Sequence, residues 1–223
     1  MTQFVLARAT ANDMAEIVQV QYEAFTAKHV RELFMGCTSA EDLLRLAKKY
    51  AQDMASDPND IWVKVTDLAT GSVVAASNWR LYLGPSSVQP RGMDKAMPWV
   101  DGQLAAQAED ILQPMNRARI ANNKEPFIHL HILFTSPTHL RRGIGSMMMR
   151  WGCELADLLF IPAWIEASAE GNLLYQKFGF YNQQKLMHKG EDMGTCMRRH
   201  ARSSADAVRP ANPQEGGINF GVL

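Results

Sequence analysis

The sequence has few cysteines, no long apolar run and no excess of either charge, and each shortage excludes a class of protein. The 223 residues include three cysteines, Cys37, Cys153 and Cys196, which are far apart and form no Cys-x-x-Cys pair. This argues against a disulfide scaffold and a zinc site, and it favours a reducing compartment. Basic and acidic residues both number 23, so no global positive field exists to attract nucleic acid. No stretch approaches the roughly 18 apolar residues of a membrane span.

From these shortages we expect a protein of the cytoplasm that contacts neither nucleic acid nor membrane. Two further features bear on its location and on metal binding. Residues 1–8 lack the charged and apolar regions of a secretory signal. Three consecutive methionines, Met147 to Met149, lie on a predicted helix, where the filling of core gaps is favoured over a soft metal site. We therefore expect no metal, and we expect a monomer or a homodimer.

Hydrophobic periodicity predicts one α/β (α+β) domain with a mixed central sheet flanked by helices. The predicted strands cover 4–8, 61–66, 72–83, 127–134, 162–167 and 180–189. The predicted helices cover 14–25, 30–34, 43–56, 99–120, 143–160 and 171–178. The short connection 67–71 predicts an antiparallel hairpin. Strand 127–134, helix 143–160 and strand 162–167 form a right-handed βαβ unit if the two strands share a sheet.

The periodicity also predicts where the domain ends. No regular pattern persists from Gly190 onward, and prolines and glycines are scattered through the last residues. We therefore expect a single domain over 1–189, with a helical insertion at about 99–120, and a mobile tail over 190–223.

A short segment that opens the predicted helix 143–160 carries the first chemical signal. It reads Arg141-Arg142-Gly143-Ile144-Gly145-Ser146 and directly follows a strand. The first turn of a helix has unpaired N–H groups and a partial positive charge, and glycines let an anion approach closely, so the segment suits a phosphate or pyrophosphate. It matches neither the P-loop nor the dinucleotide fingerprint. On these residues alone, a solvated tight turn and a nucleotide-binding α/β domain both stay open.

A second segment follows one strand later and reads Leu174-Tyr175-Gln176-Lys177-Phe178-Gly179-Phe180. Together the two segments resemble the GNAT superfamily of acyl-CoA-dependent N-acyltransferases. That pattern has Gln/Arg-x-x-Gly-x-Gly/Ala opening a helix, then a strand, then a helix with Leu-Tyr-x-Lys-x-Gly-Phe. The step Glu166-Ala-Ser-Ala-Glu-Gly171 looks closest to fungal-type members. The resemblance covers most of 3–189, and two positions depart from it: Leu140 replaces Gln/Arg, and Ser168 replaces a frequent Asn.

The resemblance implies an acetyl-CoA-dependent N-acetyltransferase with splayed strands at the CoA site. A primary amine, from a small molecule or a peptide, would attack the thioester directly in a ternary complex. Acetyl-CoA would be a co-substrate, and Tyr175 would be the general acid for its thiolate. The cofactor-binding residues that the resemblance implies are Leu133, Phe134, Thr135, Arg141, Arg142, Gly143, Ile144, Gly145, Ser146, Ser168 and Tyr175.

An alkyl ammonium acceptor has a pKa of about 10.4 and must lose a proton before it attacks. His129 and His131 alternate along strand 127–134, and the period of two places both on the face of Leu133. Histidine titrates in the useful range, and Glu166 on the neighbouring strand is the other candidate. We take His131 and Glu166 as the candidate bases, while a purely structural role stays open for each single residue.

A second function also fits the sequence. The departures at Leu140 and Ser168 are what a non-catalytic acyl-CoA-binding or sensing module of the same fold would show. Release of free thiol from acetyl-CoA in the presence of an amine separates the two functions.

Overall fold

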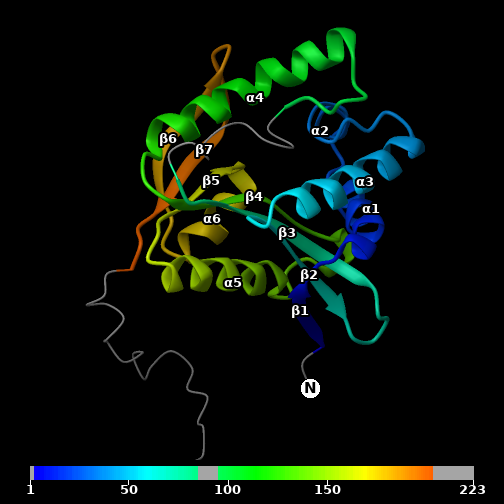
Figure 1. Cartoon of the computed structure of the whole chain (residues 1–223), viewed down its shortest axis with the longest axis horizontal. Helices are drawn as coiled ribbons and strands as arrows, with labels where there is room; N and C mark the ends of the chain where they lie inside the picture. The colour runs from blue at the N-terminus through cyan, green and yellow to red at the C-terminus, as the bar shows by residue number, and fades with distance from the viewer. Residues whose placement is uncertain (1–2, 85–94, 203–223) are drawn as a thin grey trace, which may run out of the picture.

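Seven strands form one open sheet in the computed structural model, which describes residues 3–84 and 95–202 (Figure 1). Their order across the sheet is β1-β2-β3-β4-β5-β7-β6. Only the central pair β4–β5 is parallel among these strands, and every other neighbouring pair is antiparallel. The strands are β1 (Phe4–Arg8), β2 (Asp60–Asp67), β3 (Val73–Tyr82), β4 (Phe127–Thr135), β5 (Ala163–Ala167), β6 (Tyr181–His188) and β7 (Glu191–Arg199).

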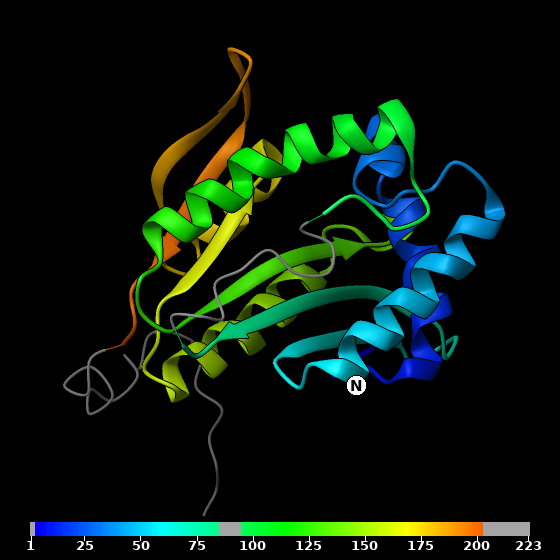
Figure 2. The ribbon, with the colours of Figure 1, turned by 45° about the horizontal axis from the view of Figure 1, so that its top comes forward.

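Helices cover both faces of the sheet in the described part of the chain (Figure 2). On one face, α5 and α6 pack on the centre of the sheet and bury a continuous apolar cluster with β2 to β5. On the other face, α1 and α3 cover β2 to β4, while residues of α4 pack near β4, β5, β6 and β7. The helices are α1 (Met14–Ala24), α2 (Lys28–Leu33), α3 (Ala40–Ser56), α4 (Gly102–Asn122), α5 (Ile144–Leu158) and α6 (Ala169–Gln176).

This architecture confirms the predicted fold class, a mixed sheet flanked by helices. The hairpin β2–β3 is antiparallel as predicted. Strand β4, helix α5 and strand β5 follow one another, and β4 and β5 are parallel neighbours in one sheet. The predicted insertion at 99–120 is the 21-residue helix α4.

The predicted tail is wrong for its first ten residues. Residues 191–199 form β7, which lies inside the sheet between β5 and β6 and pairs with both. The pattern of apolar residues does not predict this strand, because a glycine and four charged residues interrupt the alternation in Glu191-Asp-Met-Gly-Thr-Cys-Met-Arg-Arg199. The rest of the predicted tail, from 203 onward, lies outside the described residues.

The predicted alternation along β4 is also wrong, and the cause is a β-bulge. Asn78 of β3 pairs with Ile132, but the next residue, Trp79, pairs with Leu130, so His131 is an extra residue in β4. An extra residue shifts the side-chain period by one. Leu130 therefore packs in the cluster under α5, whereas Ile132 packs on the opposite face with α1 and α3.

Helix α5 approaches the sheet closely because a glycine faces a tryptophan. A Cβ atom at Gly152 would lie 2.1 Å from Cζ2 of Trp79, whose ring is fully buried. The indole is fixed in turn, because its Nε1 donates to Oγ of Ser77 at 3.0 Å. The contact between Gly152 and Trp79 therefore fixes the distance between α5 and β3.

Gly152→Ala should therefore destabilise the protein. Replacing glycine with alanine within a helix gains about 1 kcal/mol of helix propensity, but forcing a methyl group into a packed core costs about 1–3 kcal/mol or more. We expect a net loss of unfolding free energy, measured by urea denaturation. Gly84→Ala is the control, because no described residue lies within 4 Å of the place that its Cβ atom would take. A Gly152→Ala protein as stable as the Gly84→Ala protein would contradict this account of the packing.

Candidate functional site

The two parallel strands at the centre of the sheet separate almost at once. Strands β4 and β5 pair only at Ile128–Ala163 and His129–Trp164. From Leu130 onward, the edge of β4 that faces β5 has no strand partner among the described residues, although its other edge pairs with β3 as far as Thr135. The predicted cofactor contacts at 133–135 lie on this open edge. A polar, extended molecule can therefore add to it as a strand would.

The N-terminus of α5 follows the open strand β4 after a short connection, 136–143, and its first turn leaves backbone amides unpaired among the described residues. Gly143 caps the helix with a left-handed backbone, φ 82°, and the space beside it is open for at least 4 Å. The first helical hydrogen bond runs from Met147 N–H to Gly143 C=O at 3.1 Å. The N–H groups of 144–146 find no acceptor within 3–84 or 95–202, and they form the positive end of the helix dipole.

The two arginines before this turn differ. The Arg142 guanidinium donates to Oε1 of Gln3 at 2.7 Å and lies 4.8 Å from the centre of the Phe4 ring. It therefore anchors the turn to β1, and it would have to share these contacts to reach a phosphate. Arg141 is exposed and adopts a left-handed backbone, φ 63°. Arg141 is therefore better suited than Arg142 to contact an anion at this turn, because its side chain is exposed.

Tyr175 lies on the α5 side of the opening, and its ring folds back over its own helix. A Cβ atom at Gly171 would lie 2.7 Å from Cε2 of Tyr175 and 3.0 Å from its hydroxyl oxygen. The hydroxyl therefore sits beside the first turn of α6, just after the end of β5. Burial raises the pKa of Tyr175 to about 12. Gly171 was not among the predicted site residues, although its spacing of four from Tyr175 is the signal that could have found it.

Glu166 lies on the opposite face and is held by four donors. Oε1 accepts from Arg119 Nε at 3.1 Å and from Trp164 Nε1 at 2.6 Å. Oε2 accepts from Arg119 Nη2 at 3.2 Å and from His129 Nε2 at 2.8 Å. Burial alone would raise the pKa of this carboxyl, but Arg119 and His129 hold it well below its ordinary value. A carboxylate so strongly stabilised in its charged form is a weak base.

His131, the bulge residue, lies next to this cluster. Its ring is T-shaped against that of His129, with 5.5 Å between the ring centres. His131 is half-buried, whereas the side chain of His129 is fully buried. The structure therefore brings the predicted His131 and Glu166 together through His129, and it separates them from Tyr175 by the thickness of the sheet.

The remaining predicted residues take local roles. The Ser168 hydroxyl caps α6 by accepting from the Gly171 N–H at 3.3 Å. Leu140, which replaces the family's Gln or Arg, is exposed. Arg119 was missing from the predicted site, because nothing along helix α4 marks it as the buried partner of a glutamate 47 residues away.

The cysteines offer no obvious nucleophile. All three are free and buried. Burial raises the pKa of Cys37 and Cys196 to about 12 and that of Cys153 to about 11, so none is a thiolate near neutral pH.

Two kinds of feature are absent from the described residues. They contain no group of three or more His, Cys, Asp or Glu side chains that could hold a metal ion. No helix in 3–84 or 95–202 has both the length and the apolar character needed to cross a membrane.

Comparison with solved structures shows which fold this is. A structure described as "histone acetyltransferase HPA2 and related acetyltransferase" from Corynebacterium glutamicum matches with a TM-score of 0.59 and 17% identity, over 91% of this chain and 98% of that one. Mosquito arylalkylamine N-acetyltransferase like 5b matches with a TM-score of 0.59 and 14% identity, over 88% and 99%. The chain therefore has the fold of the GNAT acetyltransferases.

A third match contains a ligand. The PaiA N-acetyltransferase from Thermoplasma acidophilum, solved in complex with coenzyme A, matches with a TM-score of 0.50 and 10% identity, over 89% of this chain and 99% of that one. No protein-family model matches the chain. None of the three structures is fungal, so the resemblance to fungal-type members stays a prediction.

Glu166→Gln tests the structural role of the buried cluster. The change leaves Arg119 buried without its counter-charge, which costs about 3–5 kcal/mol of unfolding free energy near neutral pH. Because the pKa of Glu166 is lower in the folded state, its stabilising contribution is complete above the ordinary glutamate pKa of about 4.3 and is lost as the pH falls below it. Urea denaturation should therefore show that the difference in unfolding free energy between wild type and variant is constant above about pH 5 and narrows from there to pH 3.

Asp192→Asn is the matched control for this experiment. Asp192 pairs with Lys185, and both side chains are at least half exposed, so its loss should leave the urea midpoint unchanged. A Glu166→Gln protein that behaves like this control would show that the buried cluster does not stabilise the fold.

Proposed function

We propose that this protein is an acetyl-CoA-dependent N-acetyltransferase in which a primary amine attacks the thioester directly, within a ternary complex. One observation carries the proposal: the open edge of β4 leads straight to the unpaired amides of 144–146 at the N-terminus of α5. An extended polar arm that ends in a diphosphate matches this combination of open strand edge and anion site. The fold, shared with acetyltransferases, supports the same activity.

The chain offers suitable groups for each part of the donor. Bound acetyl-CoA would supply a thioester carbonyl and a thiolate leaving group. The backbone of Leu133, Phe134 and Thr135 would pair with the pantetheine arm, and the amides of 144–146 would hold the diphosphate. Arg141 would add a positive charge there. Backbone donors on the open edge of β4 would also polarise the carbonyl.

His131 is the base that we propose for the acceptor amine. An amine with a pKa of 10.4 is almost fully protonated at pH 7, roughly 3.4 units below that pKa. Deprotonating it at this pH therefore costs about 4.6 kcal/mol. Glu166 is a poor candidate because four donors already stabilise its charged form. His131 is half-buried at the bulge, beside the opening, and imidazole accepts protons near neutral pH. Glu166 and His129 instead form the buried support on which the His131 ring rests.

Tyr175 is the acid that we propose for the leaving thiolate. Burial keeps its hydroxyl protonated throughout the neutral range, so it is always present as a donor. The thiol of free CoA is a stronger acid than this phenol, but burial of the sulfur raises the pKa of the thiol as well and reduces the mismatch. The acid and the base thus act from opposite faces of the sheet. None of the buried cysteines is suited to a covalent acyl intermediate, which favours direct attack.

A non-catalytic acyl-CoA-binding module is the second candidate. Leu140 is exposed where a polar contact is expected, and Ser168 is engaged as a helix cap. Such a module would bind acetyl-CoA and release no thiol with any amine. Steady thiol release in the presence of an acceptor dismisses it.

Ligand-dependent stabilisation tests the donor class. A ligand present at 100 times its Kd adds about 2.7 kcal/mol of stability, and for a chain of this size about 2–4 °C per kcal/mol is expected. Acetyl-CoA should therefore raise the melting temperature by about 5–10 °C, measured by thermal shift. ATP and NAD at the same concentration should have a clearly smaller effect. A shift with ATP or NAD but not with acetyl-CoA would favour the nucleotide-binding domain instead.

Tyr175→Phe tests the acid. The variant should lose most of its kcat while its Kd for CoA, measured by calorimetry, stays close to that of wild type, because only the hydroxyl is removed. Gly171→Ala should also lower kcat, because the added methyl displaces the Tyr175 ring. Tyr181→Phe is the control, since this tyrosine lies on the exposed strand β6. An unchanged kcat in Tyr175→Phe would remove Tyr175 from the mechanism.

A further inference from the structure

Helix α4 crosses the face of the sheet on which His131 and Glu166 lie. In both views it runs from the neighbourhood of α2 to that of β6 (Figure 1), and in Figure 2 the strands β4 and β5 diverge beneath it. With 21 residues it is about 30 Å long, close to the width of a small domain. We call this helix, together with the contacts that fix it, the α4 bridge. Three groups of polar contacts anchor it to distant parts of the chain, and Asn122 at its end also contacts Gln184 and Arg198.

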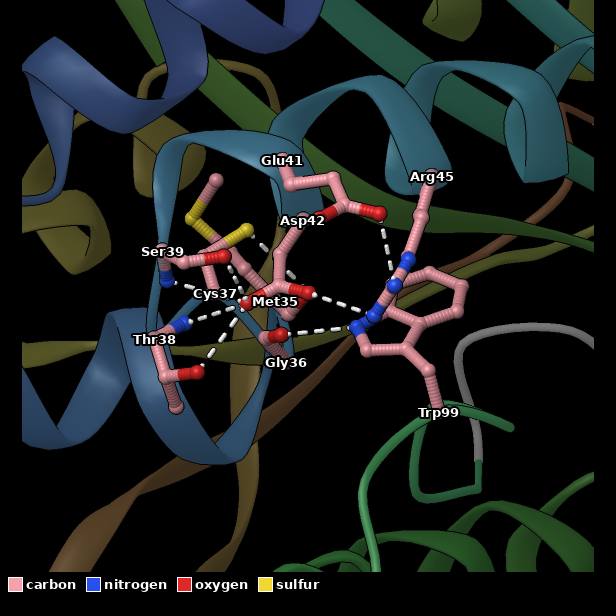
Figure 3. A network of polar contacts seen from close by, with 9 residues as sticks. All are labelled: Met35, Gly36, Cys37, Thr38, Ser39, Glu41, Asp42, Arg45 and Trp99. Carbon is pink, nitrogen blue, oxygen red and sulfur yellow. Dashed lines mark hydrogen bonds and ion pairs between the residues drawn. The ribbon is translucent and has the colours of Figure 1, made fainter.

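The first anchor is the connection between α2 and α3 (Figure 3). Oδ2 of Asp42 accepts from the backbone N–H and the hydroxyl of both Thr38 and Ser39, at 2.9–3.0 Å. Burial opposes its charge, but these hydrogen bonds hold the pKa of Asp42 below its ordinary value. On this rigid connection, the C=O of Gly36 accepts from Nε1 of Trp99 at 2.8 Å. The segment that leads into α4 is thereby tied to the α2–α3 side.

The second and third anchors lie on the opposite side. Oδ2 of Asp110, midway along α4, is paired with His188 Nε2 at 3.1 Å and with Lys189 Nζ at 2.5 Å, at the β6–β7 turn. Near the end of the helix, Arg119 binds both oxygens of Glu166 on β5. The bridge is therefore joined to the α2–α3 connection, to the β6–β7 turn and to the centre of the sheet.

Two of the carboxylates buried on this face are each paired with an arginine among the described residues. The side chains of Asp60 and Arg80 are buried and lie 3.5 Å apart, and Glu166 is paired with Arg119. Both of these buried carboxylates are thus already neutralised by arginine. A polycation would need carboxylates that are still available to it.

From these contacts we infer that the acceptor is a small primary monoamine, and that the α4 bridge excludes peptides and protein tails. This inference rests on the proposed acetyl transfer. An extended peptide needs a continuous groove along which its backbone can lie, and the bridge crosses the face that such a groove would occupy. A small amine needs an opening only as wide as itself. The α5 face offers no alternative route, because α5, α6 and the sheet fill it with one apolar cluster.

The test compares three acceptors in a thiol-release assay with acetyl-CoA. The probes are phenethylamine, spermidine and a ten-residue peptide with a free N-terminus and one lysine. We expect kcat/KM for phenethylamine to exceed that for the peptide and for spermidine by at least about tenfold. A peptide or spermidine that reacts as well as phenethylamine overturns the inference.

The bridge itself is tested with Asp110→Ala, which cuts the tie to the β6–β7 turn and touches no proposed catalytic residue. We expect the peptide-to-phenethylamine ratio of kcat/KM to rise, with phenethylamine itself changing by less than about twofold. Asp192→Asn is the matched control, because it breaks an ion pair within the same hairpin without contacting α4. A ratio that is the same in both variants overturns the role assigned to the bridge.

Failure of the inference can be told apart from failure of the proposed function. If acetyl-CoA binds but thiol is released with none of the acceptors, calorimetry on the CoA-saturated protein should measure the binding of phenethylamine and of the peptide. Binding of phenethylamine without binding of the peptide supports the inference although transfer has failed. Binding of the peptide, or of neither, overturns it. If acetyl-CoA itself does not bind, the proposed function fails, and amine binding to the free protein decides the acceptor class by the same criteria.

Discussion

The early separation of β4 and β5 is the constraint on which the rest of the site depends. Two residue pairs join these strands, and beyond them each strand exposes backbone groups that a continuous sheet would have satisfied. Unsatisfied backbone groups in the middle of a fold are costly, so such an opening persists only if the surroundings enforce it. The extra residue at His131 bends β4 just beyond the paired positions, and on the α4 face Glu166 binds side chains of α4, β4 and β5. An extended ligand with amide groups, as in the proposed donor, would restore the missing hydrogen bonds.

The buried pair of Arg119 and Glu166 is better understood as a positioning device than as a source of stability. Taking two charges out of water costs nearly as much as their attraction returns, so the pair adds little net stability compared with apolar residues of the same size. Its geometry is demanding, however, because both carboxylate oxygens must meet one guanidinium. That demand fixes α4 relative to β5. The same carboxylate therefore ties β5 to His129 of β4 and to Arg119 of α4, and so fixes the helix over the two strands.

The sequence predicted the features that consecutive residues form, and it did not predict those that depend on contacts between distant segments. The segment 141–146 could be identified because a helix N-terminus is built from consecutive residues, and the alternation of apolar residues located six of the seven strands. The β-bulge at His131 could not be found, since it exists only relative to the pairing partner Trp79. Strand β7 was missed because its neighbours in the sheet, rather than its own polar composition, stabilise it. Arg119 acquires its role only when α4 is laid across β5.

The same distinction explains why the donor half of the site is easier to identify than the acceptor half. The proposed donor would be held by backbone amides and an open strand edge, which depend on the fold, and the fold is shared with structures of only 10–17% identity. The proposed acceptor side consists of side chains from distant segments and of α4, which ion pairs join to β5 and to the β6–β7 turn. Changing such a helix can alter access to the site without disturbing the donor side. The chemistry of the acceptor must therefore be sought in how α4 is anchored.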